Sequence, residues 1–144
     1  MRIKVNGEEV YAATGGQEFD PAKPLVIFLH GAGFDHSAWA LYTRWHSHHG
    51  FSVLAPDLPG HGLSSGKPLA SVAELADWVA ALIDASGAKQ ARLIGHSLGT
   101  FIAIEAAARH PGKVASLGLI ATATTMPGTT LTRNSQCHEK ALLR

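Results

Sequence analysis

The serine of the pentapeptide Gly95-His96-Ser97-Leu98-Gly99 is the side chain of this sequence best suited to covalent chemistry. The spacing G-x-S-x-G is typical of a serine on a sharp turn between a strand and a helix, where its hydroxyl is exposed for attack on a carbonyl carbon. The flanking glycines leave room for such a tight turn. The pentapeptide therefore predicts a nucleophile at Ser97.

A second pentapeptide, Gly62-Leu63-Ser64-Ser65-Gly66, has the same spacing, so the context has to separate the two. An apolar, strand-like run ends just before Ser97 and a helical pattern begins just after it, as the turn requires. Ser64 has proline and glycine on both sides and neither a strand nor a helix beside it. We therefore assign the nucleophile to Ser97 and interpret Ser64 as a loop residue.

The elements that must position this serine alternate along the chain. Ile3, Val5, the turn Asn6-Gly7 and the run 10–13 predict a hairpin. We expect strands at 25–29, 51–56, 91–94 and 114–120, and helices at 37–48, 71–87 and 98–110. The alternation predicts an α/β fold: a mostly parallel sheet with helices on both faces and an N-terminal antiparallel hairpin.

Three motifs, in this order, resemble the α/β-hydrolase family, and in particular its small esterases and its haloperoxidase-like and C–C-hydrolase-like members. They are Phe28-Leu29-His30-Gly31-Ala32-Gly33, Asp57-Leu58-Pro59-Gly60-His61-Gly62 and Gly95-His96-Ser97-Leu98-Gly99, with Trp39 between the first two. The resemblance covers residues 1 to about 125. It implies hydrolysis of an ester, acyl or C–C bond through a Ser97 acyl-enzyme, a small ester-like substrate and no cofactor.

The resemblance also implies which groups stabilise the oxyanion that forms on the attacked carbonyl. The backbone N–H groups of Leu98 and Ala32 are the expected donors, because preorganised donors of this kind lower the barrier of acyl transfer. The residues expected to support the motifs are His30, Gly31, Gly33, Gly95, His96 and Gly99. We expect His30 to brace its loop by hydrogen bonds, and Asp57 to hold loop structure.

A serine hydroxyl also needs a general base and an orienting carboxylate, which in this family follow the serine along the chain. Glu105 and His110 lie too far along the helix that leaves Ser97, roughly 12 and 20 Å away at about 1.5 Å per residue. His138 and Glu139 stand in a threonine-rich, then polar, tail that matches no motif. We therefore predict that the catalytic acid and histidine are missing.

These observations predict an α/β-hydrolase fold truncated before its last strands. We expect residues 1–125 to form the N-terminal part of the domain and residues 126–144 to be an atypical tail, either disordered or a short helix, from truncation or a frame shift. The strand 114–120 would be an exposed edge. The alternatives are a non-catalytic remnant that dimerises or binds through this edge, and half of a split hydrolase completed by another chain.

Composition excludes several other classes of function. Twelve basic and eleven acidic side chains give a formal charge of +1, which offers no electrostatic basis for binding nucleic acid or an acidic membrane. The single cysteine, Cys137, cannot form an internal disulfide, and no apolar run approaches the roughly 18 residues of a membrane span, so we expect a cytoplasmic protein. His46 and His49 share a helical face, but we predict no metal site there.

Overall fold

The N-terminal hairpin follows directly from its turn sequence. The computed structural model describes residues 1–121, beginning with strands β1 (Arg2–Val5) and β2 (Glu8–Ala13). Asn6 and Gly7 between them have φ angles of 52° and 85°, as a two-residue type I′ turn requires. The β1–β2 pairing is antiparallel, as predicted.

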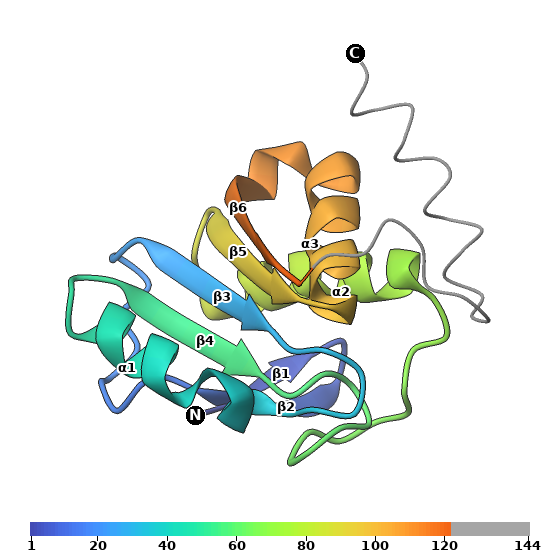
Figure 1. Cartoon of the computed structure of the whole chain (residues 1–144), viewed down its shortest axis with the longest axis horizontal. Coiled ribbons are helices and arrows are strands. Elements are labelled where there is room, and N and C mark those ends of the chain that lie inside the picture. Colours follow the sequence, from blue (N-terminus) through green and yellow to red (C-terminus); the bar gives the residue numbers. More distant parts are fainter. Residues whose placement is uncertain (122–144) are drawn as a thin grey trace.

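Four apolar strands continue the sheet: β3 (Leu25–Leu29), β4 (Ser52–Pro56), β5 (Ala91–His96) and β6 (Val114–Ile120). The order across the sheet is β1-β2-β4-β3-β5-β6 (Figure 1). Strands β4, β3, β5 and β6 pair in parallel, and β2 is antiparallel to β4. The predicted α/β class, with a mostly parallel sheet and an antiparallel N-terminal hairpin, is confirmed.

Capping residues set the bounds of the helices. Helix α2 (Val72–Ser86) begins with the predicted capping box of Ser71 and Glu74, and ends at Gly87 in the left-handed conformation. Helix α3 (Leu98–Arg109) follows Ser97, and a short turn η2 (Pro111–Lys113) precedes β6. The helix expected at 37–48 is instead a 3-10 turn η1 (His36–Trp39) followed by α1 (Ala40–Ser47).

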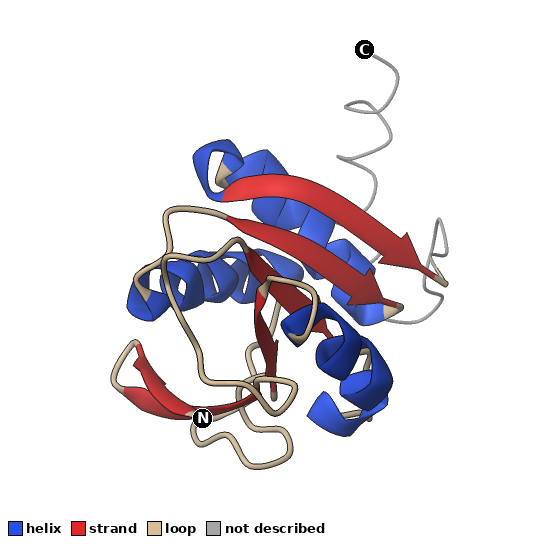
Figure 2. Cartoon of the chain, turned by 90° about the vertical axis from the view of Figure 1, so that its left-hand side faces the viewer, coloured by secondary structure: helices blue, strands red, loops and turns tan. Residues whose placement is uncertain are grey.

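Side chains of β3 alternate between two cores because successive residues of a strand point to opposite faces. Leu25, Ile27 and Leu29 pack with α2 and α3, whereas Val26 and Phe28 pack on the other face with Trp39. All five side chains of β3 are at most 2% exposed. Figure 2 shows the strands with helices on either side. Strand β3 therefore anchors the segment that follows it rigidly.

Ion pairs join the two helices that cover one face. The carboxylate of Asp77 on α2 accepts hydrogen bonds from the Arg109 guanidinium, at 3.0 and 2.8 Å, and from His110 at 2.7 Å. These donors, Arg109 first, lower the pKa of Asp77 to about 2. Two turns further along α2, Asp84 pairs with Lys113 of η2. The pairs fix the end of α3 and the following turn against α2.

Strand β6 has a neighbour on one side only within residues 1–121. Its side chains are exposed or half-buried throughout, and Leu117, Leu119 and Ile120 are 41%, 43% and 39% exposed. The strand carries no charge or proline that would discourage pairing with another strand. The expected exposed edge is therefore present in the described part of the chain, whereas the tail at 126–144, with His138 and Glu139, lies outside it.

Candidate active site

The carboxyl ends of the parallel strands bring three of the predicted residues to one edge of the sheet. His30 follows β3, Asp57 follows β4 and Ser97 follows β5. Strand β3 lies between β4 and β5, so the loop after β3 is placed between the other two. This edge is where ligands bind in open parallel sheets.

Ser97 stands on a strained turn between β5 and α3. Its φ and ψ angles are 51° and −115°, a combination that costs a residue with a Cβ of the order of 1–3 kcal/mol. Its N–H donates to the carbonyl of Ile120 at 3.1 Å, and its carbonyl accepts from the N–H and the hydroxyl of Thr100. No residue in the range 1–121 makes a hydrogen bond with its Oγ. The hydroxyl is thus presented at the sheet edge on a backbone fixed from both sides.

The glycines on either side of Ser97 are required by close backbone approach. A Cβ on Gly99 would lie 2.7 Å from the carbonyl carbon of Leu29, and one on Gly95 would lie 2.6 Å from the amide nitrogen of Thr100. Real Cβ atoms essentially never come within 3.0 Å of such atoms. The G-x-S-x-G spacing at 95–99 therefore reflects packing of α3 directly against β3 and β5.

The loop after β3 touches this turn. A Cβ on Gly31 would lie 3.3 Å from the Cβ of Ser97 and 3.2 Å from Nδ1 of His96, which is tighter than most real Cβ contacts and would require a shift of a few tenths of an ångström. Ala32 and Gly33 follow in an exposed turn, where Gly33 has a φ of 76°. Within residues 1–121, the N–H groups of Ala32 and Leu98 donate no hydrogen bond. Two unused backbone donors thus flank the turn that carries Ser97.

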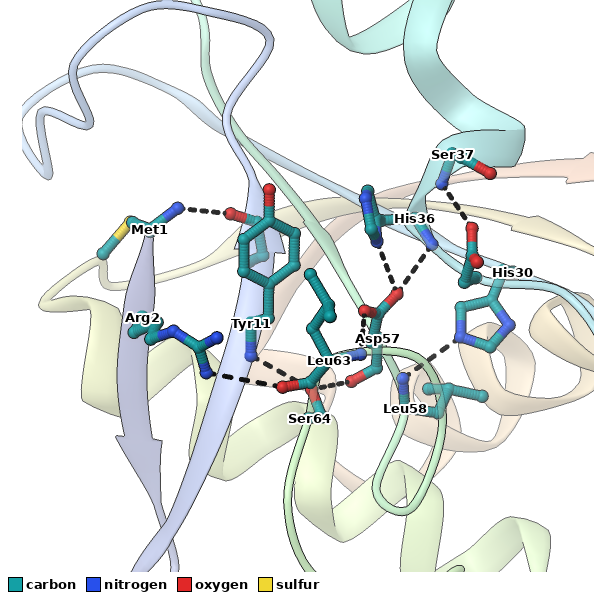
Figure 3. Close-up of polar contacts among 12 residues, drawn as sticks. Met1, Arg2, Tyr11, His30, His36, Ser37, Asp57, Leu58, Leu63 and Ser64 are labelled. Atoms are coloured by element: carbon teal, nitrogen blue, oxygen red, sulfur yellow. Dashed lines mark hydrogen bonds and ion pairs between the residues drawn. The ribbon is translucent and has the colours of Figure 1, made fainter.

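The His30 ring is completely buried and bridges two loops (Figure 3). Its Nδ1 is 2.8 Å from the carbonyl oxygen of Gly31, and its Nε2 accepts from the N–H of Leu58 at 3.1 Å. Burial, the largest effect, lowers the pKa of His30, although the hydrogen bond to Gly31 opposes it. The arrangement agrees with the expected role as a brace.

The Asp57 carboxylate is also completely buried and holds two loops together (Figure 3). One oxygen accepts from the backbone N–H of His36 at 2.7 Å and faces its ring Nδ1 at 2.8 Å. The other oxygen accepts from the N–H of Leu63 at 2.8 Å. Asp35, His36 and Asp57 offer potential metal ligand atoms within 4.8 Å of one another, but those of His36 and Asp57 are engaged in these contacts.

Ser64, the serine of the second pentapeptide, has a structural role. Its hydroxyl donates to the carbonyl of Asp57 at 2.7 Å and accepts from the N–H of Tyr11 at 3.0 Å. The loop that carries it is thereby fixed to strand β2, with a strand on neither side of Ser64 itself. A serine with both hydrogen bonds committed to the backbone is poorly placed to act as a nucleophile.

A cavity of about 160 Å³ lies beside the turn. Its walls are largely aromatic: the His96 ring lies edge-on to Phe34 at 5.9 Å and to Trp39 at 6.5 Å. The lining residues are His30, Phe34, Ala38, Trp39, Tyr42, His96 and Ile120. A larger cavity, of about 740 Å³, lies between the hairpin, the 59–69 loop and α2, away from Ser97.

The described residues do not place a base and a carboxylate beside Ser97. Glu105 lies 3.8 Å from Arg109 of the same helix, and His110 binds Asp77 on α2. His46 and His49 each bring Nδ1 within 2.8 Å of a backbone carbonyl of α1, those of Tyr42 and Trp45. No helix in the described part is long and apolar enough to cross a membrane.

Comparison with known proteins agrees with this geometry. The family model described as alpha/beta hydrolase fold matches residues 24–136, which is most of the chain. The chain belongs to the alpha/beta hydrolase fold family. The resemblance drawn from the three motifs is confirmed, and the sheet is the corresponding part of that fold.

The relatives of this hydrolase-fold chain include proteins whose names describe different activities. It is 43% identical over 104 residues to a pimeloyl-[acyl-carrier protein] methyl ester esterase of Chromobacterium violaceum, covering 69% of this chain and 37% of the relative. It is 35% identical over 111 residues to the dihydrolipoyllysine-residue acetyltransferase component of the acetoin cleaving system of Cupriavidus necator, covering 76% and 28%.

A solved structure described as a membrane phospholipase A, a novel bacterial virulence factor, has 36% sequence identity and a TM-score of 0.76. The alignment covers 90% of this chain and 41% of that protein. The chain therefore spans well under half the length of these relatives. The activities in their names belong to the whole relatives, and what this chain shares with them is the fold.

Proposed function

We propose that this chain carries the nucleophile half of a serine hydrolase, which attacks an ester, acyl or related C–C bond through Ser97. The observation that carries the proposal is the backbone of Ser97, held in a strained conformation between a strand and a helix. Strain of this kind persists where the surroundings over-determine it, and it gathers at functional sites. An esterase among the relatives supports the same class of reaction.

The chemistry follows from the groups around the turn. Ser97 Oγ would form a bond to the carbonyl carbon while its proton passes to a base, and the carbonyl oxygen would take up negative charge. The N–H groups of Ala32 and Leu98 would donate to that oxygen, and each such donor is worth about 3–4 kcal/mol of barrier in serine hydrolases. The Leu98 donor also lies at the N-terminus of α3, whose dipole favours negative charge.

The cavity beside His96 would receive one side of the substrate. Its aromatic walls suit a small apolar group next to the scissile carbonyl rather than a charged one. The base and its carboxylate must come from residues outside 1–121, such as His138, or from a second chain, because the described residues supply neither beside Ser97.

Labelling with a fluorophosphonate probe tests the proposal. The wild-type chain and Ser97→Ala are incubated side by side, and the modified residue is located by peptide mass spectrometry. Labelling at Ser97 that disappears in Ser97→Ala supports the proposal, and His138→Ala then shows whether that histidine is the base. A folded wild-type chain that remains unlabelled at millimolar probe contradicts it.

The exposed edge of β6 favours a second candidate function, a non-catalytic module that pairs with another copy of the chain. Three apolar side chains, Leu117, Leu119 and Ile120, are each about two-fifths exposed there. Light scattering after size exclusion would show a dimer that Leu119→Lys converts to a monomer. A monomer at all concentrations contradicts this candidate, whereas a stable complex with a different chain that also restores Ser97 labelling would indicate a split hydrolase.

A further inference from the structure

A cavity of about 470 Å³ lies at the edge of the sheet where the parallel strands begin, opposite to the arrowheads of Figure 1. It is formed by residues of the segments 21–25 and 87–92, which lead into β3 and β5, and by Ala115 near the start of β6. Arg92 and Ser97 are five residues apart along β5 and the turn after it, about 16 Å at about 3.3 Å per residue. The cavity is therefore separate from the candidate active site.

The charged side chains that line this cavity are all cations: Lys23, Lys89 and Arg92. Among residues 1–121, none of the three forms an ion pair. The acidic residue nearest to Lys23 in the sequence, Asp20, accepts a hydrogen bond from the N–H of Ala22 at 2.9 Å. The dipole at the end of α2 attracts Lys89 but does not account for the other two cations. Cations gathered in a hollow without a counter-charge indicate a site for an anion.

A β-bulge lies in β6 next to Arg92. Ala91 of β5 pairs with Val114, but Arg92 pairs with Ser116, so Ala115 is an extra residue in the ladder. Bulges are rare between parallel strands, and they occur where a side chain is turned toward a site. Because Ala115 also lines the cavity, the irregularity in the sheet coincides with the cluster of cations.

Arg92 also borders a second cavity, of about 180 Å³, on the face of the sheet that carries α1. Its walls include Val26, Phe51, Ile94 and Leu117. The guanidinium carbon of Arg92 lies 5.5 Å from the centroid of the Phe51 ring, which holds the cation beside both cavities. This volume is below the roughly 300–1,000 Å³ of pockets for drug-sized ligands, so it suits a short apolar chain.

We propose that the two cavities together bind a phosphate monoester of a short apolar alcohol. The phosphate lies between Lys23, Lys89 and Arg92, and the apolar chain lies in the second cavity. Three cations suit a phosphate monoester, with its charge of about −1.5 to −2, better than a singly charged carboxylate. The planar guanidinium can donate two parallel hydrogen bonds to phosphate oxygens. The site does not depend on the proposed hydrolase function, since Ser97 lines neither cavity.

Titration of the full chain with hexyl phosphate, followed by the amide shifts in NMR spectra, tests the proposal. We expect shifts at Lys89, Arg92 and Ala115, and a dissociation constant at least about tenfold below that for inorganic phosphate, because each buried methylene group adds about fourfold in affinity. Hexanoate should bind about threefold more weakly than hexyl phosphate. Equal affinity for hexyl phosphate and either of the other two probes would overturn the proposal, and so would unchanged shifts at these three residues.

Substitutions that remove one charge show whether these cations hold the phosphate. Arg92→Gln should weaken the binding of hexyl phosphate at least about tenfold, because hydrogen bonds between charged groups are lost. Lys23→Gln and Lys89→Gln, both at exposed positions, should weaken it about threefold each, and they decide the matter if Arg92→Gln does not fold. Lys4→Gln removes the same charge from β1 at the other end of the sheet and should have no effect. Equal losses in Lys4→Gln and in the other variants would show attraction by net charge alone and overturn the proposal.

A pair of matched leucines tests the place of the apolar chain. Leu117 and Leu119 are 41% and 43% exposed on the same strand, but only Leu117 lines the second cavity. Leu117→Thr should weaken the binding of hexyl phosphate about fivefold and leave that of inorganic phosphate unchanged, because apolar contact is lost. Leu119→Thr should change neither. The same effect in both variants, or the same effect on both probes, would contradict the proposed position of the chain.

Discussion

Replacing Gly99 by alanine has two effects of opposite sign on the stability of the protein. Gly99 is the second residue of α3, where alanine is the better helix former by up to about 1 kcal/mol. On helix propensity alone, Gly99→Ala should stabilise the protein. The packing of α3 on β3 predicts the reverse, so the sign of the change decides which effect controls the turn.

The size of the packing effect follows from the atoms that the new methyl group would meet. It would lie 2.7 Å from the carbonyl carbon of Leu29, closer still to the attached oxygen, and 3.1 Å from the oxygen of His30. These are backbone atoms of a fully buried strand, so α3 must move away by most of an ångström. Overpacking of this kind costs about 3 kcal/mol or more, which leaves a net loss of about 2 kcal/mol.

Thermal unfolding followed by circular dichroism measures this loss. At about 3 °C per kcal/mol for a chain of this size, we expect Gly99→Ala to melt about 6 °C or more below the wild type. Gly112→Ala is the matched control, because Gly112 is exposed and a Cβ there meets nothing within 4 Å, and it should be neutral or slightly stabilising. A melting temperature of Gly99→Ala at or above that of the wild type would refute the packing argument.

Four further outcomes are expected. Ser64→Ala should lose about 1–2 kcal/mol of stability in urea, because it removes two backbone hydrogen bonds, yet retain any labelling at Ser97; loss of labelling at unchanged stability would argue for a direct role. Ser71→Ala should cost about 1 kcal/mol as a lost helix cap, and an unchanged urea midpoint would speak against the capping box. Burial lowers the pKa of His30, so the His30 ring is protonated at higher pH in the unfolded chain than in the folded chain. The wild type should therefore lose stability relative to His30→Asn as the pH falls below about 6.5. Parallel plots of stability against pH for the two proteins would contradict this. The pKa of Asp77 is lowered to about 2, so the stabilisation by its carboxylate is present above about pH 4 and is lost toward pH 2. Asp77→Asn should therefore lose less stability than the wild type between pH 4 and pH 2. The same loss in both proteins would show that the ion pair with Arg109 contributes nothing.

Patterns over a few neighbouring residues predicted the elements well. Within residues 1–121 each predicted strand and helix is present, because apolar runs, the Asn6-Gly7 turn and the capping box act locally. The turn η1 starts at His36, one residue before the expected start at residue 37. The side chain of Asp35 accepts a hydrogen bond from the N–H of Ser37 and so caps the start of this turn. Strand β5 likewise extends to His96, since it pairs with β6 up to that residue.

The contacts that assemble the candidate site could not be read from neighbours in the sequence. Ser64 forms a hydrogen bond with Tyr11, and Asp57 with His36. In each pair the two residues are far apart in the sequence, and no sequence pattern predicts that they meet. The resemblance placed His30 and Asp57 in motifs, but it did not show that Leu58 donates to one ring nitrogen of His30. Tertiary hydrogen bonds of this kind depend on where two loops meet, which sequence spacing does not determine.

The hydrogen bond from the Ser97 N–H to the Ile120 carbonyl has a consequence for how the protein is made. Domains fold as the chain emerges during synthesis, N-terminal parts first, at about 5–20 residues per second. When Ser97 leaves the exit tunnel of the ribosome, the strand that supplies this acceptor is still inside the tunnel. During synthesis there is therefore a stage in which the turn at Ser97 lacks this hydrogen bond. The bond can form only when Ile120 leaves the exit tunnel.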